Sequence, residues 1–396
     1  MEETSCPVCH SKDMQKIYPE YTGPCITSDT EILPSATIEN RICRGCGLIF
    51  NAGGTRGATK EFYRDSYSLM TKSNDAAIQS FQGPQAKSQA ERTFDFLMKF
   101  RDWPEAGSVL EAGAGKGEFL GFFVRRFPDW KAAAFEPSRS HEFLTKALPG
   151  VATRRCDYHA YEVGNDKVDL VVSLGVLEHV ENPLDMLVWV NRQLDDNGHF
   201  FLRVPNFAKN PNDLFCADHL SKLTLPTIRA LTGAAGFEVL AVDETGVPLF
   251  ALLVKRGAPN GETGNAYEEN IATVRQNEGI AQGIVDSVLN CRARAMGMGE
   301  PFAIFGMASA GLFAPFVGCF DPHEIAAFLD DNRTIWGGTV HGRPIGGPNL
   351  ITAKGIKHVA LSVSPVYFEQ IRAKLAPLGV SVYTAGCCEP AGNPAK

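Results

Sequence analysis

Apolar runs and helical periodicity alternate along the middle of the chain. Buried strands are predicted at residues 108–111, 131–136, 168–174 and 198–204. The segment 117–127 predicts a helix, and runs at 238–242 and 251–255 predict a terminal pair of strands. The continuous apolar run at 168–174 is typical of a central parallel strand. Strands separated by helices predict an α/β fold with a doubly wound parallel sheet.

The region before this alternation has a different pattern. Residues 1–75 are rich in Gly, Thr, Ser, Cys and Pro and show little helical periodicity. They predict a loop-and-strand module that is too small to bury a sizeable core alone. Residues 76–104 predict a helical segment with an apolar face that leads into the first strand.

A second α/β pattern follows the first. The polar, glycine-containing segment 257–266 predicts a linker, and 267–296 predicts a long polar helix. Further strands are predicted at 302–305, 326–329, 358–362 and 380–383. With 396 residues, the chain is long enough for two or three domains. We therefore expect three domains, with the boundaries 1–75, 76–256 and 257–396.

Composition limits the partners and the location. The chain has 44% hydrophobic and 21% charged residues, which is ordinary for a globular protein. Its net charge is -7 and it has no lysine or arginine block, which argues against a nucleic-acid partner held through its phosphates. No apolar run reaches the roughly 18 residues of a membrane span, and residues 1–6 lack the features of a signal peptide. We expect a cytoplasmic protein without a membrane partner, and its oligomeric state stays open.

Two cysteine pairs stand at the start of the chain. Cys6-Pro-Val-Cys9 and Cys43-Arg-Gly-Cys46 are C-x-x-C motifs, each of which aims two thiolates at one point. Together they predict a closed tetrahedral zinc site with a structural role. The spacer of residues 10–42 is longer than the roughly 15–20 residues of compact zinc ribbons, so a small subdomain must lie between the pairs. The alternatives are two unrelated pairs or a redox dithiol.

A glycine-rich segment follows the first predicted strand. Glu111-Ala-Gly-Ala-Gly-Lys-Gly117 joins a strand to a helix, and its glycines allow close backbone approach to a ligand. Such a loop suits dinucleotides as well as S-adenosylmethionine. Glu111 would repel a pyrophosphate, whereas S-adenosylmethionine carries an ammonium group and no phosphate. Glu136 ends the next strand, about 20 residues on, where a carboxylate takes both ribose hydroxyls.

Further residues complete the predicted cofactor site. Asp157 follows the next strand and is a candidate for the adenine amine, although it is equally a solvated loop charge. The loop residues Gly113, Ala114, Gly115 and Gly117, together with Pro137 and Ser173, are assigned to the same site. These residues predict an S-adenosylmethionine-dependent methyltransferase.

The chain resembles the S-adenosylmethionine-dependent sugar C-methyltransferases, which act on nucleotide-linked deoxysugars. The resemblance is carried by the two cysteine pairs and by Val109–Gly117, Leu177–Pro183, Asp218–Ser221, Leu231–Phe237, Phe305–Gly311 and Leu329–Asn332. It covers nearly the whole chain. It implies a zinc-binding module, a class I methyltransferase domain and a Rossmann-like C-terminal domain, in that order. An O- or N-methyltransferase acting on a sugar or another small metabolite is the alternative.

The resemblance also implies a substrate and a reaction. The substrate is a nucleotide sugar bound between the middle and C-terminal domains, methylated on a ring carbon beside a ketone. Such a carbon needs a base to remove its proton and donors to stabilise the enolate oxygen. His219, at the carboxyl end of a strand, is the leading base, and Asp218 orients or charges the site. The family tends to have a tyrosine two places before this acid, where this chain has Cys216.

Three more residues are candidates for the catalytic site. His179 lies in a region where the family places a histidine, but histidines of this motif also pack structurally in many methyltransferases. Tyr63 and Tyr67 lie between the zinc module and the cofactor domain, where family members use a tyrosine, and Tyr67 is preferred. In the C-terminal domain, the turn 306–311 is a poor dinucleotide fingerprint that either holds a pyrophosphate or packs simply. His341 and Arg343 are candidate phosphate contacts there.

Overall fold

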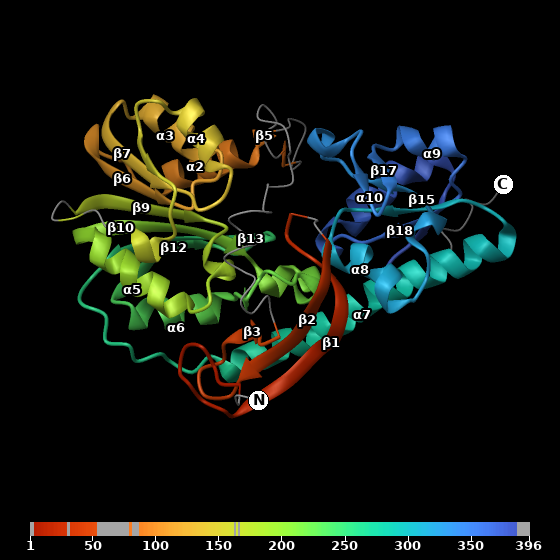
Figure 1. Ribbon diagram of the computed structural model, residues 1–396, viewed down its shortest axis with the longest axis horizontal. Helices are drawn as coiled ribbons and strands as arrows, with labels where there is room; N and C mark the ends of the chain where they lie inside the picture. Colours follow the sequence, from red (N-terminus) through yellow and green to blue (C-terminus); the bar gives the residue numbers. More distant parts are fainter. Residues whose placement is uncertain are drawn as a thin grey trace. The chain divides into compact units, whose positions relative to one another are not determined.

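A seven-stranded sheet occupies the middle of the chain (Figure 1). The computed structural model describes residues 4–29, 32–53, 79–80, 87–161, 164 and 167–385. The sheet consists of β6 (Ala106–Ala112), β7 (Asp129–Phe135), β8 (Ala152–Arg154), β9 (Val168–Leu174), β10 (Leu194–Pro205), β12 (Phe237–Asp243) and β13 (Pro248–Lys255). Their order is β12-β13-β10-β9-β6-β7-β8. Strand β13 runs antiparallel to both neighbours, whereas the pairs from β10 to β8 are parallel.

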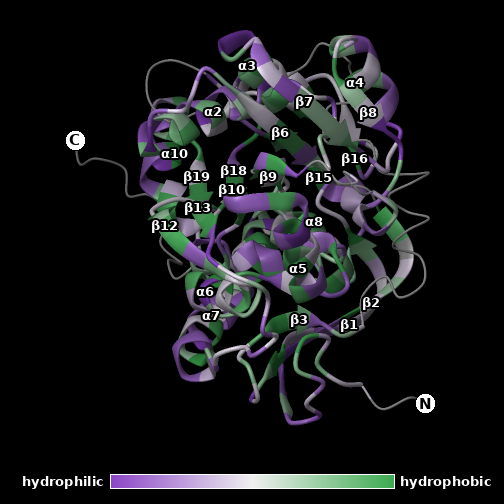
Figure 2. Ribbon diagram, turned by 90° about the vertical axis from the view of Figure 1, so that its left-hand side faces the viewer, coloured by the Kyte–Doolittle hydropathy of each residue, from purple (hydrophilic) through white to green (hydrophobic). Residues whose placement is uncertain are grey.

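Helices cover both faces of this sheet (Figure 1). They are α2 (Gln89–Phe100), α3 (Glu118–Arg126), α4 (His141–Ala147), α5 (Pro183–Gln193) and α6 (Leu225–Ala234). Successive strand residues point to opposite faces. Val109 and Phe201 therefore join the core formed with α2 and α3, whereas Leu110 and Phe200 join the core formed with α5 and α6. Figure 2 shows hydrophobic residues on the sheet strands and hydrophilic residues on the outside of α3. The predicted doubly wound sheet is confirmed.

Local capping fixes where the helices after the central strands begin. Asn182 accepts hydrogen bonds from the first backbone amides of α5, and Pro183 occupies the first turn, where it needs no hydrogen-bond donor. Thr224 caps α6 in the same way. The chain between β9 and α5 is consequently a tight connection, which contains the short 3-10 helix η3 (Leu177–His179).

The N-terminal strands form a separate sheet. It consists of β1 (Met14–Ile26), β2 (Ile32–Cys43), β3 (Ile49–Asn51) and β11 (Ser221–Lys222). Strand β11 follows β10 in the sequence and pairs antiparallel with β3, with Ser221 opposite Phe50. The segment that carries His219 is therefore attached to the cysteine-bearing part of the chain. A two-stranded sheet, β4 (Gln79–Ser80) with β5 (Lys87–Ser88), precedes α2.

The C-terminal part contains a second, six-stranded sheet. Its strands are β14 (Phe302–Phe305), β15 (Ile325–Leu329), β16 (Thr339–Val340), β17 (Arg343–Gly346), β18 (His358–Leu361) and β19 (Ser381–Tyr383), in the order β16-β17-β15-β14-β18-β19. The helices are α7 (Tyr267–Met298), α8 (Ser309–Val317), α9 (Asn349–Lys354) and α10 (Phe368–Leu375). Short 3-10 helices occur at Tyr158–Ala160 (η2), Phe207–Lys209 (η4), Pro211–Phe215 (η5), Pro322–Glu324 (η6), Arg333–Ile335 (η7), Pro365–Tyr367 (η8) and Ala376–Leu378 (η9).

Two compact units result. Unit 1 comprises Met1–Ile17, Asn40–Phe207 and Asp218–Ala272, and unit 2 comprises Tyr18–Glu39, Ala208–Ala217 and Thr273–Lys396. The division passes through β1, β2 and α7. The three domain boundaries expected from the sequence stay a prediction.

Some elements differ from the expected bounds. The helix expected over residues 76–104 spans Gln89–Phe100, because Ser88 caps its first turn through the amide of Glu91. The long polar helix runs from Tyr267 to Met298, close to the prediction. Among the described residues, no helix is long and apolar enough to cross a membrane.

Candidate active site and cysteine centre

The glycine-rich loop turns at the carboxyl end of β6. The φ angles of Gly113, Gly115 and Gly117 are 71°, 55° and 82°, in the left-handed region that favours glycine. A Cβ at Gly113 would lie 2.5 Å from Cγ2 of Val176, and one at Gly117 would lie 2.7 Å from Cδ1 of Leu144. The loop therefore packs against the connection after β9 as closely as its backbone allows. No larger residue fits there without a shift.

The buried end of β7 holds this loop. The backbone amides of Gly113 and Ala114 both donate to the carbonyl of Phe135, each at 3.0 Å. The amide of Gly115 donates to Oε2 of Glu136 at 2.9 Å. The other oxygen of Glu136, Oε1, accepts the amide of Ser138 at 2.9 Å. The carboxylate of Glu136 thus joins the glycine loop to the turn after β7.

Glu111 is buried at the end of β6, with 2% of its surface exposed. Burial raises the pKa of its carboxyl to about 8, partly offset by the positive charge of Arg203. Its Oε2 has no hydrogen-bond partner within the described part of the chain. The same is true of the hydroxyl of Ser173 on β9, the strand beside β6. Buried polar atoms without partners are costly, which indicates that a ligand or water completes this edge of the sheet.

The remaining predicted cofactor residues, Pro137 and Asp157, lie after β7 and β8 and are partly buried. Pro137 follows Glu136 and is partly buried. Asp157 is also partly buried, and its Oδ1 accepts the amide of Ala160 at 3.2 Å, so it caps η2. This contact gives Asp157 a structural role whether or not it binds adenine.

Histidines from two segments meet within unit 1. His179 ends η3, and Asp218 and His219 precede β11. The rings of His179 and His219 are 4.7 Å apart between centroids, in an edge-to-face arrangement. Nδ1 of His179 lies 3.0 Å from the carbonyl oxygen of Asp218 and 3.6 Å from its Oδ2. The structure thus brings together the three catalytic candidates that it describes.

The surroundings of these histidines are buried. Asp218 is fully buried and His219 is 9% exposed. Lys222, also fully buried, donates from Nζ to the carbonyl of His219 at 2.6 Å and fixes that backbone. Cys216 is 2% exposed. Tyr63 and Tyr67 lie outside the described residues.

Three further residues belong to this region and were not predicted from the sequence: Glu178, Arg203 and Lys222. Glu178 is 3% exposed, and its Oε2 has no partner among the described residues. Arg203 lies beside Glu111, and Lys222 braces His219. Glu178 precedes His179 in the same sequence motif, so its place beside the site could have been predicted. Its burial could not have been predicted, because a charged residue in a loop is ordinarily solvated.

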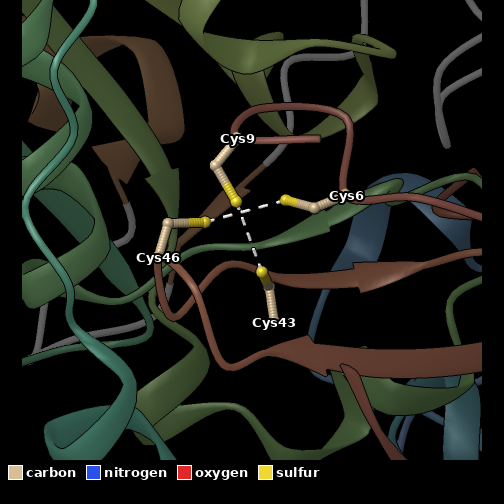
Figure 3. Close-up of side chains that lie close together, drawn as sticks. All are labelled: Cys6, Cys9, Cys43 and Cys46. Carbon is tan, nitrogen blue, oxygen red and sulfur yellow. Dashed lines mark hydrogen bonds between the residues drawn. The ribbon is translucent and has the colours of Figure 1, made fainter. Parts of the chain in front are cut away.

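The four cysteines of the two C-x-x-C motifs converge (Figure 3). Sγ of Cys6 is 3.6 Å from Sγ of Cys46, and Sγ of Cys9 is 3.5 Å from Sγ of Cys43. Four thiolates around a tetrahedral zinc ion at about 2.3 Å would be separated by about 3.8 Å. Each motif forms a turn of the same kind. The amide of His10 donates to the carbonyl of Cys6 in the first motif, and the amide of Gly47 donates to the carbonyl of Cys43 in the second. The arrangement fits the predicted zinc ligands.

In unit 2, one acid repeats the arrangement seen at Glu136. Asp330 follows β15, and its two carboxylate oxygens accept the amides of Met307 at 3.1 Å and Asn332 at 2.8 Å. The two candidate phosphate contacts are engaged elsewhere. Nε2 of His341 lies 2.9 Å from the carbonyl of Leu312, and Arg343 donates from Nε to the carbonyl of Ile325 at 2.5 Å. Both side chains brace the unit's own backbone.

Comparison with known proteins gives one family match. The family profile described as a methyltransferase domain matches residues 85–242. The tRNA U34 carboxymethyltransferase of Campylobacter jejuni is 27% identical over 177 residues, which cover 38% of this chain. The chain spans 57% of the length of that relative.

Solved structures are similar over less than half of the chain. An S-adenosylmethionine-dependent methyltransferase from Clostridium acetobutylicum has 11% identity and a TM-score of 0.37, and covers 43% of this chain and 94% of its own. The plantazolicin methyltransferase BpumL, solved with S-adenosylhomocysteine (SAH), has 14% identity and a TM-score of 0.36, and covers 42% and 83%. The family match covers residues 85–242, and the expected class I methyltransferase fold is confirmed.

The substitution Glu111→Gln should change how stability depends on pH. The folded-state pKa of Glu111 is raised from 4.5 to about 8 by burial. Between these values the folded protein keeps a proton that the unfolded chain releases, so this residue makes the free energy of unfolding fall as the pH rises. Glutamine does not titrate and removes that contribution.

Urea unfolding between about pH 5 and about pH 8 measures the effect. We expect the stability of Glu111→Gln relative to the wild-type protein to rise across this window and to level off above it. A difference that stays constant with pH would show that Glu111 is already ionised in the folded protein.

Proposed function

We propose that the chain is an S-adenosylmethionine-dependent methyltransferase that methylates a carbon of a nucleotide-linked keto-deoxysugar. The methyltransferase domain match and the glycine loop support the cofactor. The observation that carries the proposal is the edge of the sheet at Glu111 and Ser173, where buried polar atoms beside that loop have no partner among the residues that the structure describes. A ligand that carries a cationic group and hydroxyl groups would provide hydrogen-bond partners for these buried oxygens.

Each part of the cofactor has a matching group in unit 1. The glycine loop from Gly113 to Gly117 lets the ligand approach the backbone. The positive ammonium group of the ligand favours the ionised form of the Glu111 carboxyl, which then provides the matching negative charge. Each oxygen of Glu136 already accepts one amide and keeps a second lone pair for a ribose hydroxyl. Asp157 is proposed for the adenine amine. When bound, S-adenosylmethionine supplies an electrophilic methyl group on sulfur.

The cluster of His179, Asp218 and His219 is proposed to handle the substrate. His219 accepts the proton from the carbon beside the ketone, and the electron pair of that C–H bond passes into the enolate. The buried carboxylate of Asp218, 3.6 Å from Nδ1 of His179, stabilises positive charge on that ring. The carbon then forms its bond to the methyl group while the methyl–sulfur bond breaks, which depends mainly on positioning.

The assignment of a nucleotide sugar as the substrate depends on the sequence resemblance to the sugar C-methyltransferases. The second candidate, O- or N-methylation of a sugar or another small metabolite, needs no enolate. The relative from Campylobacter jejuni is named for a tRNA, which is a third class of substrate. The cysteine centre is proposed to hold a structural zinc ion, because four sulfurs close its coordination.

Calorimetry with SAH tests the cofactor assignment. We expect the wild-type protein to bind SAH and Gly113→Ala to bind it at least about tenfold more weakly, because the added Cβ meets Val176 and φ is positive. Gly150→Ala is the matched control, since nothing lies within 4 Å of its Cβ. Absence of binding to the wild-type protein would overturn the proposed function.

The substitution His219→Ala tests the chemistry. We expect turnover to fall by about a hundredfold or more with SAH binding unchanged, the usual scale for loss of a general base. His323→Ala, which alters an exposed histidine of unit 2, is the control. Deuterium exchange at the substrate carbon distinguishes the two candidates. A methyl group on oxygen or nitrogen, without exchange, would favour the second.

The substitution Cys43→Ser should lower the folding yield and the zinc content together, because metal binding is coupled to folding. Cys319→Ser is the control, since this cysteine is exposed and lies outside the cluster. Zinc content by mass spectrometry and the yield of folded protein provide the measurement. Full zinc loading of Cys43→Ser would contradict the assignment.

A further inference from the structure

A cavity of about 620 Å³ lies in unit 1 at the amino ends of β9 and β10. Lys167 directly precedes β9, residues 191–197 join α5 to β10, and Lys255 ends the antiparallel strand β13. Glu111 and Ser173 lie at the carboxyl ends of β6 and β9, at the opposite edge of the same sheet. The cavity is therefore separate from the proposed cofactor site. Its lining consists of Lys167, Asn191, Arg192, Asp196, Asn197 and residues 255–259.

Hydrogen bonds between its segments fix the walls of this cavity. Asn191, which is 3% exposed, donates from Nδ2 to the carbonyl of Ala235 at 2.8 Å and to that of Gly257 at 3.0 Å. The amides of Arg256 and Gly257 both donate to the carbonyl of Gly236, at 2.9 and 3.3 Å. The end of α5 is thereby joined to the chain after β13. The cavity is built into the fold by backbone contacts as well as by side chains.

Basic side chains dominate the lining. Among the described residues that line the cavity, one is acidic, Asp196, and four are basic: Lys167, Arg192, Lys255 and Arg256. The side chain of Asp196 is 99% exposed and lies 3.9 Å from Nζ of Lys255, so it offsets little of the positive charge. Like charges gathered around one cavity repel each other and concentrate a positive potential there. A bound anion would relieve this repulsion.

The two lysines are held in place and keep hydrogen-bond donors for a ligand. Nζ of Lys167 donates to the carbonyl of Arg192 at 2.5 Å, and Nζ of Lys255 donates to the carbonyl of Leu194 at 2.8 Å. An ammonium group has three N–H donors, so each of these bonds leaves two donors available. The carbonyls thus position the charges without using up their capacity to bind an anion.

The two arginines add further donors. Arg256 donates from Nε to Oε2 of Glu238 at 2.6 Å and from a terminal nitrogen to Oδ1 of Asn197 at 3.4 Å, which leaves three of its five N–H groups. Arg192 is exposed, and no described residue forms a hydrogen bond or an ion pair with its guanidinium. Its planar group is therefore available to bind an anion through two parallel hydrogen bonds.

The positive charge at this edge also acts on a neighbouring histidine. Burial, and after it the positive charges of Arg101 and Arg256, lower the pKa of His199 to about 4. His199 lies on β10, close to the residues of this strand that line the cavity. The charge of Arg256 is thus not cancelled by its ion pair with Glu238.

We propose that this cavity binds a small molecule that carries a diphosphate group. Two linked phosphates supply several negative charges and many acceptor oxygens, which match N–H donors spread over two lysines and two arginines. The volume of about 620 Å³ is typical of sites for small organic molecules and leaves room for an organic group beside the phosphates. The net charge of -7 disfavours a nucleic acid as the ligand. The site goes beyond the proposed function and leaves the role of His219 unchanged.

Calorimetry with inorganic pyrophosphate tests the site on the full chain, with SAH present to occupy the proposed cofactor site. We expect pyrophosphate to bind and Arg192→Ala to bind it at least about tenfold more weakly, because a charge-assisted hydrogen bond is lost. This substitution keeps the backbone carbonyl that holds Lys167. Lys167→Gln is a second variant with the same expected loss. Arg229→Ala, which alters an exposed arginine of α6 outside the lining, is the matched control.

Inorganic phosphate should bind at least about tenfold more weakly than pyrophosphate, since a single phosphate meets fewer of the four basic side chains. Absence of pyrophosphate binding up to millimolar concentration overturns the proposal, as does equal affinity in the wild-type protein and both cavity variants. Tighter binding of an RNA oligonucleotide that is lost in Arg192→Ala would overturn the assignment of a small molecule. SAH binding is measured separately, and its failure would overturn only the proposed function.

Discussion

The carboxylate of Glu136 joins the two backbone turns from which the proposed cofactor site is built. One oxygen holds the amide of Gly115 and the other holds the amide of Ser138. Because the group is 6% exposed, these bonds are formed away from most of the solvent and fix both turns firmly. The close packing of Gly113 against Val176 then sets the distance between the loop and the connection after β9. The placement of η3 and its histidine follows from that connection.

In unit 2, the carboxylate of Asp330 holds two backbone amides in the same way as Glu136 does in unit 1. Asp330 follows β15 and holds the turn after β14 through the amide of Met307. Burial raises the pKa of Asp330, as it does for Glu111. In each unit, a carboxylate that follows one strand therefore holds a backbone amide of the turn after the neighbouring strand. His341 and Arg343, which were expected to contact a phosphate, instead form hydrogen bonds with backbone carbonyls of unit 2.

Much of the fold was predictable because its signals are local. The apolar run at 168–174 coincides with β9, and the glycine run of 113–117 coincides with the turn before α3. The convergence of the four cysteines was predictable because each C-x-x-C motif turns on itself. The pairing of β11 with β3 was not predictable, since it joins residues about 170 positions apart through only two residues in each strand. The roles of individual site residues stay predictions.

The sequence by itself determined which chemical groups the chain has and the strand and helix periods that carry them. It placed Glu111 and Glu136 at strand ends, and therefore at one edge of a parallel sheet. Only the tertiary structure decided that Glu178 is buried with no partner for Oε2 in the described part of the chain, that His179 faces Asp218, and that His219 joins them. The physical reason is that burial and charge proximity depend on contacts between distant segments. A local pattern specifies the segments, and the packing of the sheet specifies which side chains meet.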